Sequence, residues 1–293
     1  MTQSFEPIVS EQRTDGSRNG LFRAMRNGPI AIASLILLAI AFIAVAAPLL
    51  ATTDPILIHP LERLRPGSLQ HWFGTDALGR DVYARVIFGA RTSLIVGTFV
   101  AAASIVFGLA IGVIAGYYRI ADLIIMRIMD GVMAIPSIVL AVALVAISGA
   151  SLTTVLVAIA VPEIPRVVRL VRGVILSLRS EPYVEAAISL GTPPLLLLIR
   201  HMIPNTVAPL IVQSSFVLAS AILTEAALSF LGVGLPPEIP SWGNIMSEGR
   251  KYFQLYPGLI FIPGVFLAIT VLSVNLIGDA LRDVLDPKMA KRL

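Results

Sequence analysis

The chain has 293 residues, of which 56% are hydrophobic and 14% charged, against about 25% charged in an ordinary soluble domain. With a mean hydropathy of +0.87, so many apolar side chains cannot be hidden in one soluble core, and the composition predicts a polytopic membrane protein. The 22 basic residues behind the net charge of +4 are scattered between apolar runs, which argues against nucleic-acid binding, and the absence of cysteine excludes a disulfide scaffold, a thiol nucleophile and a cysteine-ligated metal.

The N-terminal part of the chain predicts a polar tail followed by a membrane anchor. Residues 1–28 are polar and indicate a loose cytoplasmic tail. Pro29–Leu50 is uncharged and has 22 residues, enough to cross a bilayer core of about 30 Å. Ala44-Val45-Ala46 resembles a signal-peptide cleavage site. We nevertheless interpret the run as an uncleaved anchor, because it is longer than a signal core and follows a long polar segment.

An extracytoplasmic segment, 51–91, and a second span are expected next. Within this segment Asp76, Arg80 and Asp81 predict a turn held by local ion pairs. The uncharged run Thr92–Tyr118 has 27 residues and is the second span. Gly108, Gly112 and Gly116 lie four residues apart on one face of it, a spacing that permits close helix packing in lipid. We favour a partner helix within the chain over one in a second subunit.

Four more spans are predicted in the rest of the chain. The uncharged run Gly131–Pro162 has 32 residues and is too long for one crossing, so the cluster Ser148–Ser151 divides it into a hairpin of 123–147 and 152–172. The fifth and sixth spans are placed at 205–230 and 255–281. Prolines in or beside these spans indicate kinks or a cavity lining. Asp130, Glu163 and Glu225 are interpreted as interfacial or paired, and the apparent lack of mid-span acids argues against ion-coupled transport.

The charge distribution sets the orientation. With six spans and the N-terminus inside, fifteen basic residues fall on the cytoplasmic side and seven outside, which favours both termini in the cytoplasm. The expected fold is therefore all-α, with six transmembrane helices. Its segments are a tail at 1–28, a first helix at 29–50, an outer segment at 51–91, a five-helix core at 92–282 and a second tail at 283–293.

The loop 173–204, on the cytoplasmic side, predicts two short helices. Pro182 suits a first helical position and Gly191 suits the residue that ends a helix, so 182–190 forms the first. Ala186 and Ala187 give it a surface of small side chains beside the carboxylate of Glu185. Thr192 is expected to cap the second helix, which starts at Pro193-Pro194 and stops before Pro204. The first helix either enters a groove of another protein or belongs to a polar loop that caps the bundle.

Several motifs carry a family resemblance. Glu185-Ala186-Ala187, Gly191 and Ile203-Pro204 fit the EAA loop of ABC importer permeases, and the run Arg200–Asn205 resembles the version in peptide-type permeases. Three further stretches, around Phe73–Leu94, Glu225–Gly243 and Gly278–Pro287, resemble the same subfamily. The chain thus resembles the C-type subunits of the dipeptide/oligopeptide/nickel permeases across about 22–290. Pro193-Pro194 is unusual there.

The resemblance implies a type I importer permease in the bacterial inner membrane. It implies as partners a homologous second permease, two cytoplasmic ATPases, an extracytoplasmic substrate-binding protein and membrane lipid. ATP and Mg would be used by the ATPases, and this chain would bind no cofactor. The implied ATPase-coupling residues are Tyr183, Glu185, Ala186, Ala187, Gly191, Arg200, His201 and Pro204. Asp76, Arg80 and Asp81 form a possible docking patch for the binding protein, as an alternative to a purely local turn.

The chain lacks motifs for chemistry of its own. A phosphate-binding loop needs a lysine after glycine, and none of Lys251, Lys288 and Lys291 follows one. We therefore expect no enzymatic activity and no metal site in this chain. The remaining alternatives are a permease for nickel or another small solute and, from a different class, an ATP-independent secondary transporter.

Overall fold

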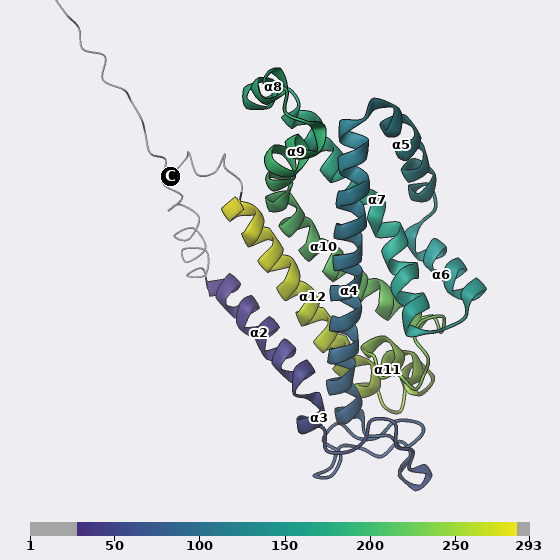
Figure 1. Ribbon diagram of the computed structural model, residues 1–293. Helices are drawn as coiled ribbons and strands as arrows, with labels where there is room; N and C mark the ends of the chain where they lie inside the picture. The colour runs from purple at the N-terminus through teal and green to yellow at the C-terminus, as the bar shows by residue number, and fades with distance from the viewer. Residues whose placement is uncertain (1–27, 286–293) are drawn as a thin grey trace, which may run out of the picture.

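The computed structural model describes residues 28–285, and no strand occurs within that range (Figure 1). The expected all-α fold class is confirmed. Most of the predicted tails 1–28 and 283–293, including Asp286 and Pro287 of the last motif, lie outside the described residues. The elements are the helices α2 (Gly28–Val45), α3 (Ala47–Leu50), η1 (Pro60–Glu62), α4 (Val82–Tyr117), α5 (Arg119–Met133), α6 (Ser137–Ser148), α7 (Leu152–Leu178), α8 (Pro182–Ser189), α9 (Pro194–Leu197), η2 (Leu198–Met202), α10 (Ile203–Phe230), α11 (Trp242–Gly249), η3 (Arg250–Tyr252) and α12 (Gly258–Leu285).

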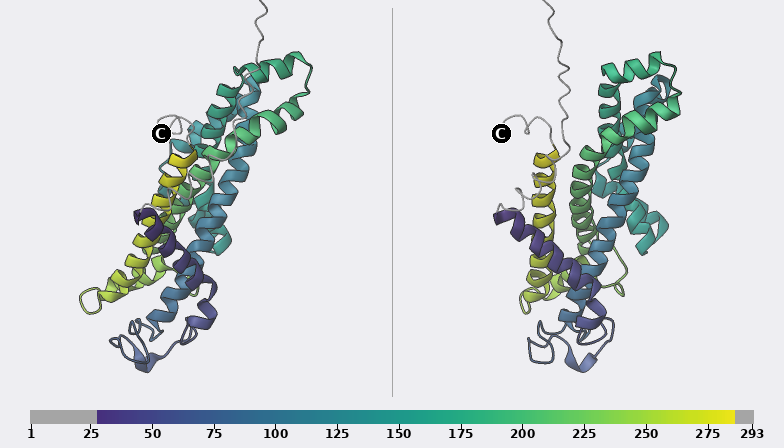
Figure 2. Two further views of the ribbon diagram at one scale, coloured as in Figure 1. Left: turned by 90° about the vertical axis from the view of Figure 1, so that its left-hand side faces the viewer. Right: turned by 60° about the vertical axis from the view of Figure 1, so that its left-hand side comes forward.

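The long helices run between two distinct ends of the molecule. Figures 1 and 2 place α8 at one end and the segment 51–81, with α11 nearby, at the other. By length and composition four stretches can cross a membrane, namely α2, α4, Pro194–Phe230 and α12, and the bent pair α5–α6 can supply a fifth. Helix α7 is not among them, because Glu163, Arg166, Arg169 and Arg172 lie along it. The six-span topology therefore stays a prediction.

Two predicted spans differ from the structure at sites of buried charge or proline. Helix α4 begins at Val82, ten residues before the predicted start at Thr92, since it contains both the exposed Arg91, where the uncharged run ends, and the buried, ion-paired Arg85. The predicted span 123–147 is not one straight helix, since α5 and α6 meet at an angle of 86°. Pro136 lies at this break and disfavours helical geometry at the residue before it.

Helices α4 and α7 form the most extensive helix pair of the chain. They run parallel, and the three predicted packing glycines of α4 are buried against α7 at matching four-residue steps: Gly108 faces Val167, Gly112 faces Val171 and Gly116 faces Ile175. The close approach that these glycines permit is thus made within the chain. These contacts also fix the position of α7 along the axis of α4.

A Gly112→Leu substitution is expected to separate these two helices. A Cβ atom at Gly112 would lie 2.7 Å from the Cβ of Val171 and 2.9 Å from the carbonyl oxygen of Val168. Overpacking of this kind costs about 1–3 kcal/mol, so the detergent-purified variant should melt at a lower temperature than the parent. Gly173→Leu is the matched control, because a Cβ at Gly173 meets no atom within 4 Å. Equal melting temperatures for the two variants would contradict the packing assignment.

A buried charge network joins the outer segment to α4 and α11. The Arg80 Nε donates to Asp76 Oδ2 at 2.7 Å, and Arg85 Nη1 also bonds to this carboxylate. Both arginines reach Glu248 of α11, with Arg85 Nη1 at 2.6 Å from Glu248 Oε2. Arg85 is only 1% exposed. The network therefore ties the end of the outer segment and the start of α4 to α11, which lies more than 150 residues further along the chain.

Asp81 has a separate role at the start of α4. Its Oδ2 accepts the backbone N–H of Ala84 at 3.0 Å and so caps the helix. The same carboxylate accepts the hydroxyl of Thr52 at 3.0 Å and lies 3.1 Å from Nδ1 of His71. Asp81 thus joins the cap of α4 to two other parts of the outer segment.

Candidate functional site

Helix α8 ends in a glycine-dependent cap. Gly191 has φ = +77°, in the left-handed region that β-branched residues resist. The N–H of Gly191 donates to Ile188 O at 2.9 Å and that of Thr192 to Ala187 O at 3.1 Å, which is the pattern of a Schellman motif. A Cβ at Gly191 would meet no atom within 4 Å. The requirement for glycine is therefore conformational rather than steric.

The two alanines of α8 do not share one surface. Ala187 is buried together with Val184, three residues before it on the same helical face, whereas Glu185 and Ala186 are exposed. The expected surface formed by both Ala186 and Ala187 is therefore wrong. Adjacent helical positions point about 100° apart, so of the three residues Glu185, Ala186 and Ala187 the first two remain available to a partner.

Large apolar side chains project around α8 instead. Leu190 is 87% exposed, and further exposed apolar residues at this end are Tyr183, Ile188, Leu195, Leu196 and Ile199. We call these six side chains the apolar rim. Exposed apolar groups gathered at one end of a molecule can mark an interaction site; Leu195, Leu196 and Ile199 belong to the stretch Pro194–Phe230, which is also apolar enough to cross a membrane. The sequence analysis named only Tyr183 of this set, although apolar residues within a loop outside any span were a usable signal.

Contacts of Tyr183, His201 and Asn205 connect α8 to the start of α10. The Nδ2 of Asn205 donates to the Tyr183 hydroxyl at 3.4 Å and to the carbonyl oxygen of His201 at 2.7 Å. The rings of Tyr183 and His201 lie 6.5 Å apart between centroids. Burial, followed by the negative charge of Glu181, raises the pKa of the Tyr183 hydroxyl.

The second helix of the loop does not stop before Pro204. Helix α9 begins at Pro194 with Pro193 as its N-cap, without the expected side-chain cap from Thr192. It continues through the π-helix η2 into α10, so that Pro194–Phe230 is one helical stretch. The ring of Pro204 would clash with the carbonyl of Arg200 in regular α geometry. The wider π turn directly before Pro204 relieves this clash.

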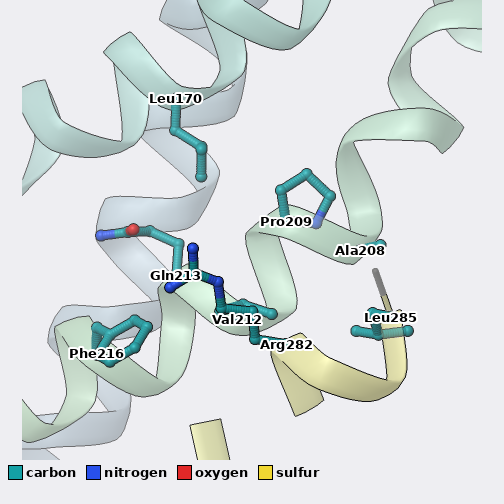
Figure 3. Close-up of a pocket in the computed structure, with 8 residues that line it drawn as sticks. All are labelled: Leu170, Ala208, Pro209, Val212, Gln213, Phe216, Arg282 and Leu285. Carbon is teal, nitrogen blue, oxygen red and sulfur yellow. The ribbon is translucent and has the colours of Figure 1, made fainter. Parts of the chain in front are cut away.

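A cavity of about 380 Å³ lies between α7, α10 and α12. Figure 3 shows the guanidinium of Arg282 and the amide of Gln213 extending into it between apolar walls. The other lining residues are Leu170, Ala208, Pro209, Val212, Phe216 and Leu285. An apolar cavity of this size with few polar groups is typical of small-molecule sites. The last family-like motif, through Arg282, therefore contributes to a cavity wall.

The charges of α7 follow one another along the helix and are paired. Arg169 Nη2 lies 2.6 Å from Asp130 Oδ1, and Arg172 Nη2 lies 2.7 Å from Asp122 Oδ2, which fastens α5 to α7. Arg166 Nη1 lies 3.2 Å from both carboxylate oxygens of Glu163.

Glu163 was expected to be interfacial or paired; it is paired, with Arg166, but it lies inside a helix and not at its end. The carboxylate is buried, and α7 continues past it to Leu178. The predicted span 152–172 thus falls six residues short of the end of the helix.

The charged residues of the outer turn are internal. Asp76, Arg80 and Asp81 are each buried and bonded within the chain, as the ion-pair interpretation of this turn describes. Their proposed role in docking a binding protein stays a prediction, and their side chains are not at the surface. Among residues 28–285, no three His, Asp or Glu side chains gather as metal ligands.

Sequence comparisons match this chain to one transport family and to permeases named for peptide transport. The family described as "Binding-protein-dependent transport system inner membrane component" matches residues 104–291. The "Probable peptide ABC transporter permease protein y4tQ" of Sinorhizobium fredii is 53% identical over 250 residues, covering 85% of this chain and 86% of that protein. The "Dipeptide transport system permease protein DppC" of Alkalihalophilus pseudofirmus is 43% identical over 270 residues, covering 92% and 89%.

Two further likenesses extend this comparison. The "Glutathione transport system permease protein GsiD" of Pectobacterium atrosepticum is 40% identical over 289 residues, covering 97% of this chain and 95% of that protein. A solved inward-facing structure of the MetNI methionine ABC transporter aligns with a TM-score of 0.56 at 20% identity, covering 68% of this chain and 95% of that chain. At this identity the structural likeness concerns the fold alone.

Proposed function

The chain belongs to the family of binding-protein-dependent transport system inner membrane components, and from this premise we propose that it is the permease subunit of an ATP-driven importer of short peptides. The family predicted from the motifs and the inner-membrane location are thereby confirmed. Peptides are the proposed substrates because the relatives compared above are named for peptide, dipeptide or glutathione transport. Transport, rather than chemistry on the substrate, is the role of such a subunit.

The observation that carries the coupling proposal is the end of the molecule formed by α8 and the apolar rim. There the exposed Glu185 and Ala186 lie beside exposed Tyr183, Ile188 and Leu190. Exposed apolar side chains around a short helix suit insertion into a groove of another protein. We propose that each of two ATPase subunits contacts one permease at such a loop, with a second permease completing the membrane part. ATP and Mg belong to the ATPases in this proposal.

Uptake by a reconstituted complex tests the proposed function. The chain would be co-expressed with a second permease, two ATPases and a binding protein encoded beside it, and placed in proteoliposomes. We expect uptake of a labelled dipeptide that requires both ATP and the binding protein. Uptake that continues after ATP depletion would instead favour an ATP-independent secondary transporter.

Thiol labelling tests the proposed orientation, and the natural absence of cysteine gives a clean background. In intact cells, a Leu190→Cys variant should react with a membrane-impermeant thiol reagent only after the cytoplasm is opened, because the exposed Leu190 is placed inside. A Ser68→Cys variant should react from outside. Labelling of the first variant in intact cells would contradict the topology with six spans and the N-terminus inside.

A further inference from the structure

Glu163 and Arg166 lie in the central part of a helix long enough to cross a membrane. Helix α7 has 27 residues, which corresponds to about 40 Å at 1.5 Å per residue. Val167, next to Arg166, packs on Gly108 of α4, deep within that apolar helix. The two charges therefore lie far from both ends of the bundle.

The guanidinium of Arg166 cannot be left facing lipid at this depth. Its side chain is 49% exposed, and arginine does not lose its charge in proteins. A charged side chain at the centre of a membrane helix is strongly disfavoured in lipid and normally faces the bundle interior or a water-filled cavity. In the assembled transporter the exposed part of Arg166 must therefore face water, a polar ligand or a polar group of the second permease.

A cavity of about 320 Å³ lies beside Arg166. Its other lining residues come from the break between α5 and α6, including Pro136 and Ser137, and from Pro162 of α7. Prolines within a span leave backbone carbonyls that a water-filled cavity can accommodate. The surroundings of Arg166 are thus suited to water and to a polar solute.

The pairing of Arg166 leaves room for a second carboxylate. Glu163 is buried and held by the hydroxyl of Ser220, which donates to Oε1 at 2.9 Å. Within residues 28–285, the hydrogen bonds of the Arg166 guanidinium all use Nη1. The Nε–Nη2 edge remains for a carboxylate, the group that a planar guanidinium binds in a bidentate way.

We infer that this face of α7 lines the route of the transported peptide, and that Arg166 binds the C-terminal carboxylate of the peptide. The inference rests on the proposed function and names the group of the substrate that the permease contacts. Every unmodified peptide carries one such carboxylate whatever its sequence. A single arginine can therefore contact many different peptides, while Glu163 balances its charge between transport events.

The first test compares a dipeptide with its C-terminal amide in the reconstituted complex. In Arg166→Gln we expect uptake of the free acid to fall at least about tenfold, since a charge-assisted bidentate contact is lost, and the acid-to-amide ratio to approach one. Arg169→Gln is the matched control, because Arg169 is similarly exposed on the same helix and pairs with Asp130. That variant should keep the parental ratio.

The outcomes separate the two proposals. Normal peptide uptake with an unchanged acid-to-amide ratio in Arg166→Gln would overturn the inference and leave the proposed function intact. Absence of ATP-dependent peptide uptake in the parent complex would overturn the proposed function and, with it, the inference.

A second test measures water access directly in the cysteine-free chain. A Ser137→Cys variant should react with a small charged thiol reagent, and transported peptide should slow the reaction. Phe107→Cys is the control, because Phe107 is an exposed apolar residue of α4 next to Gly108 and lies outside the cavity. Unreactive thiols at both positions would show that no water-filled route passes the cavity and would overturn the inference.

Discussion

A Gly191→Val variant is expected to insert into the membrane normally, yet to lose its ATPase subunits and all ATP-dependent peptide uptake. The left-handed backbone at Gly191, with φ = +77°, is strained for a β-branched residue. The chain would leave α8 in another direction, and the hydrogen bonds from Gly191 and Thr192 that close the helix would be lost. Co-purification with the ATPases and uptake in proteoliposomes measure the two effects.

Gly191→Asn provides the control for this prediction. Asparagine adopts the left-handed conformation far more readily than valine, and a side chain at this position meets no atom within 4 Å. The asparagine variant should therefore retain most of the ATPase binding. If valine is tolerated as well as asparagine, the cap of α8 does not position a coupling element.

An Ala186→Trp variant tests the exposed face of α8 itself. The bulk of the indole side chain should block docking of an ATPase subunit at this face.

An Arg85→Met variant is expected to be severely destabilised. Arg85 is almost completely buried between the carboxylates of Asp76 and Glu248. Removal of one member of a buried ion network leaves the other charges without compensation and costs about 3–5 kcal/mol. We expect a large drop in melting temperature in detergent and separation of the outer segment from α11, measured as faster proteolysis between residues 51 and 81.

Arg85→Lys separates charge from geometry in the same site. Lysine keeps the positive charge but lacks the planar fork that contacts both carboxylates, so its melting temperature should fall between those of the parent and of Arg85→Met. A methionine variant that melts with the parent would show that the network contributes no stability.

The sequence predicted those features that depend on local rules. Helix 182–190 and its ending at Gly191 followed from the positions of proline and glycine, and the structure has α8 at Pro182–Ser189. The spacing of Gly108, Gly112 and Gly116 predicted a close helix contact, and their neighbours lie on α7. These signals are local because backbone conformation and side-chain size act within a few residues.

Features that depend on distant partners were missed. The predicted second span stopped at Arg91, and the sequence could not show that α4 continues back past Arg85, whose charge Asp76 and Glu248 neutralise in the fold. The burial of Glu163 was also missed, because its contact with Ser220 comes from α10. The faces of Ala186 and Ala187 could not be separated without knowing which side of α8 packs inward. In each case the deciding group lies on another element.

The π turn at Leu198–Met202 has a consequence for insertions and deletions in this protein. A π turn holds one residue more than the α turn it replaces but still completes about one revolution of the helix. Deleting one residue from this turn would therefore leave the direction of α9, with α8 before it, almost unchanged relative to α10, but the restored α geometry would bring the ring of Pro204 against the carbonyl four residues before it. Natural variation in the length of this short stretch is therefore expected to be absent, even though its individual side chains can change.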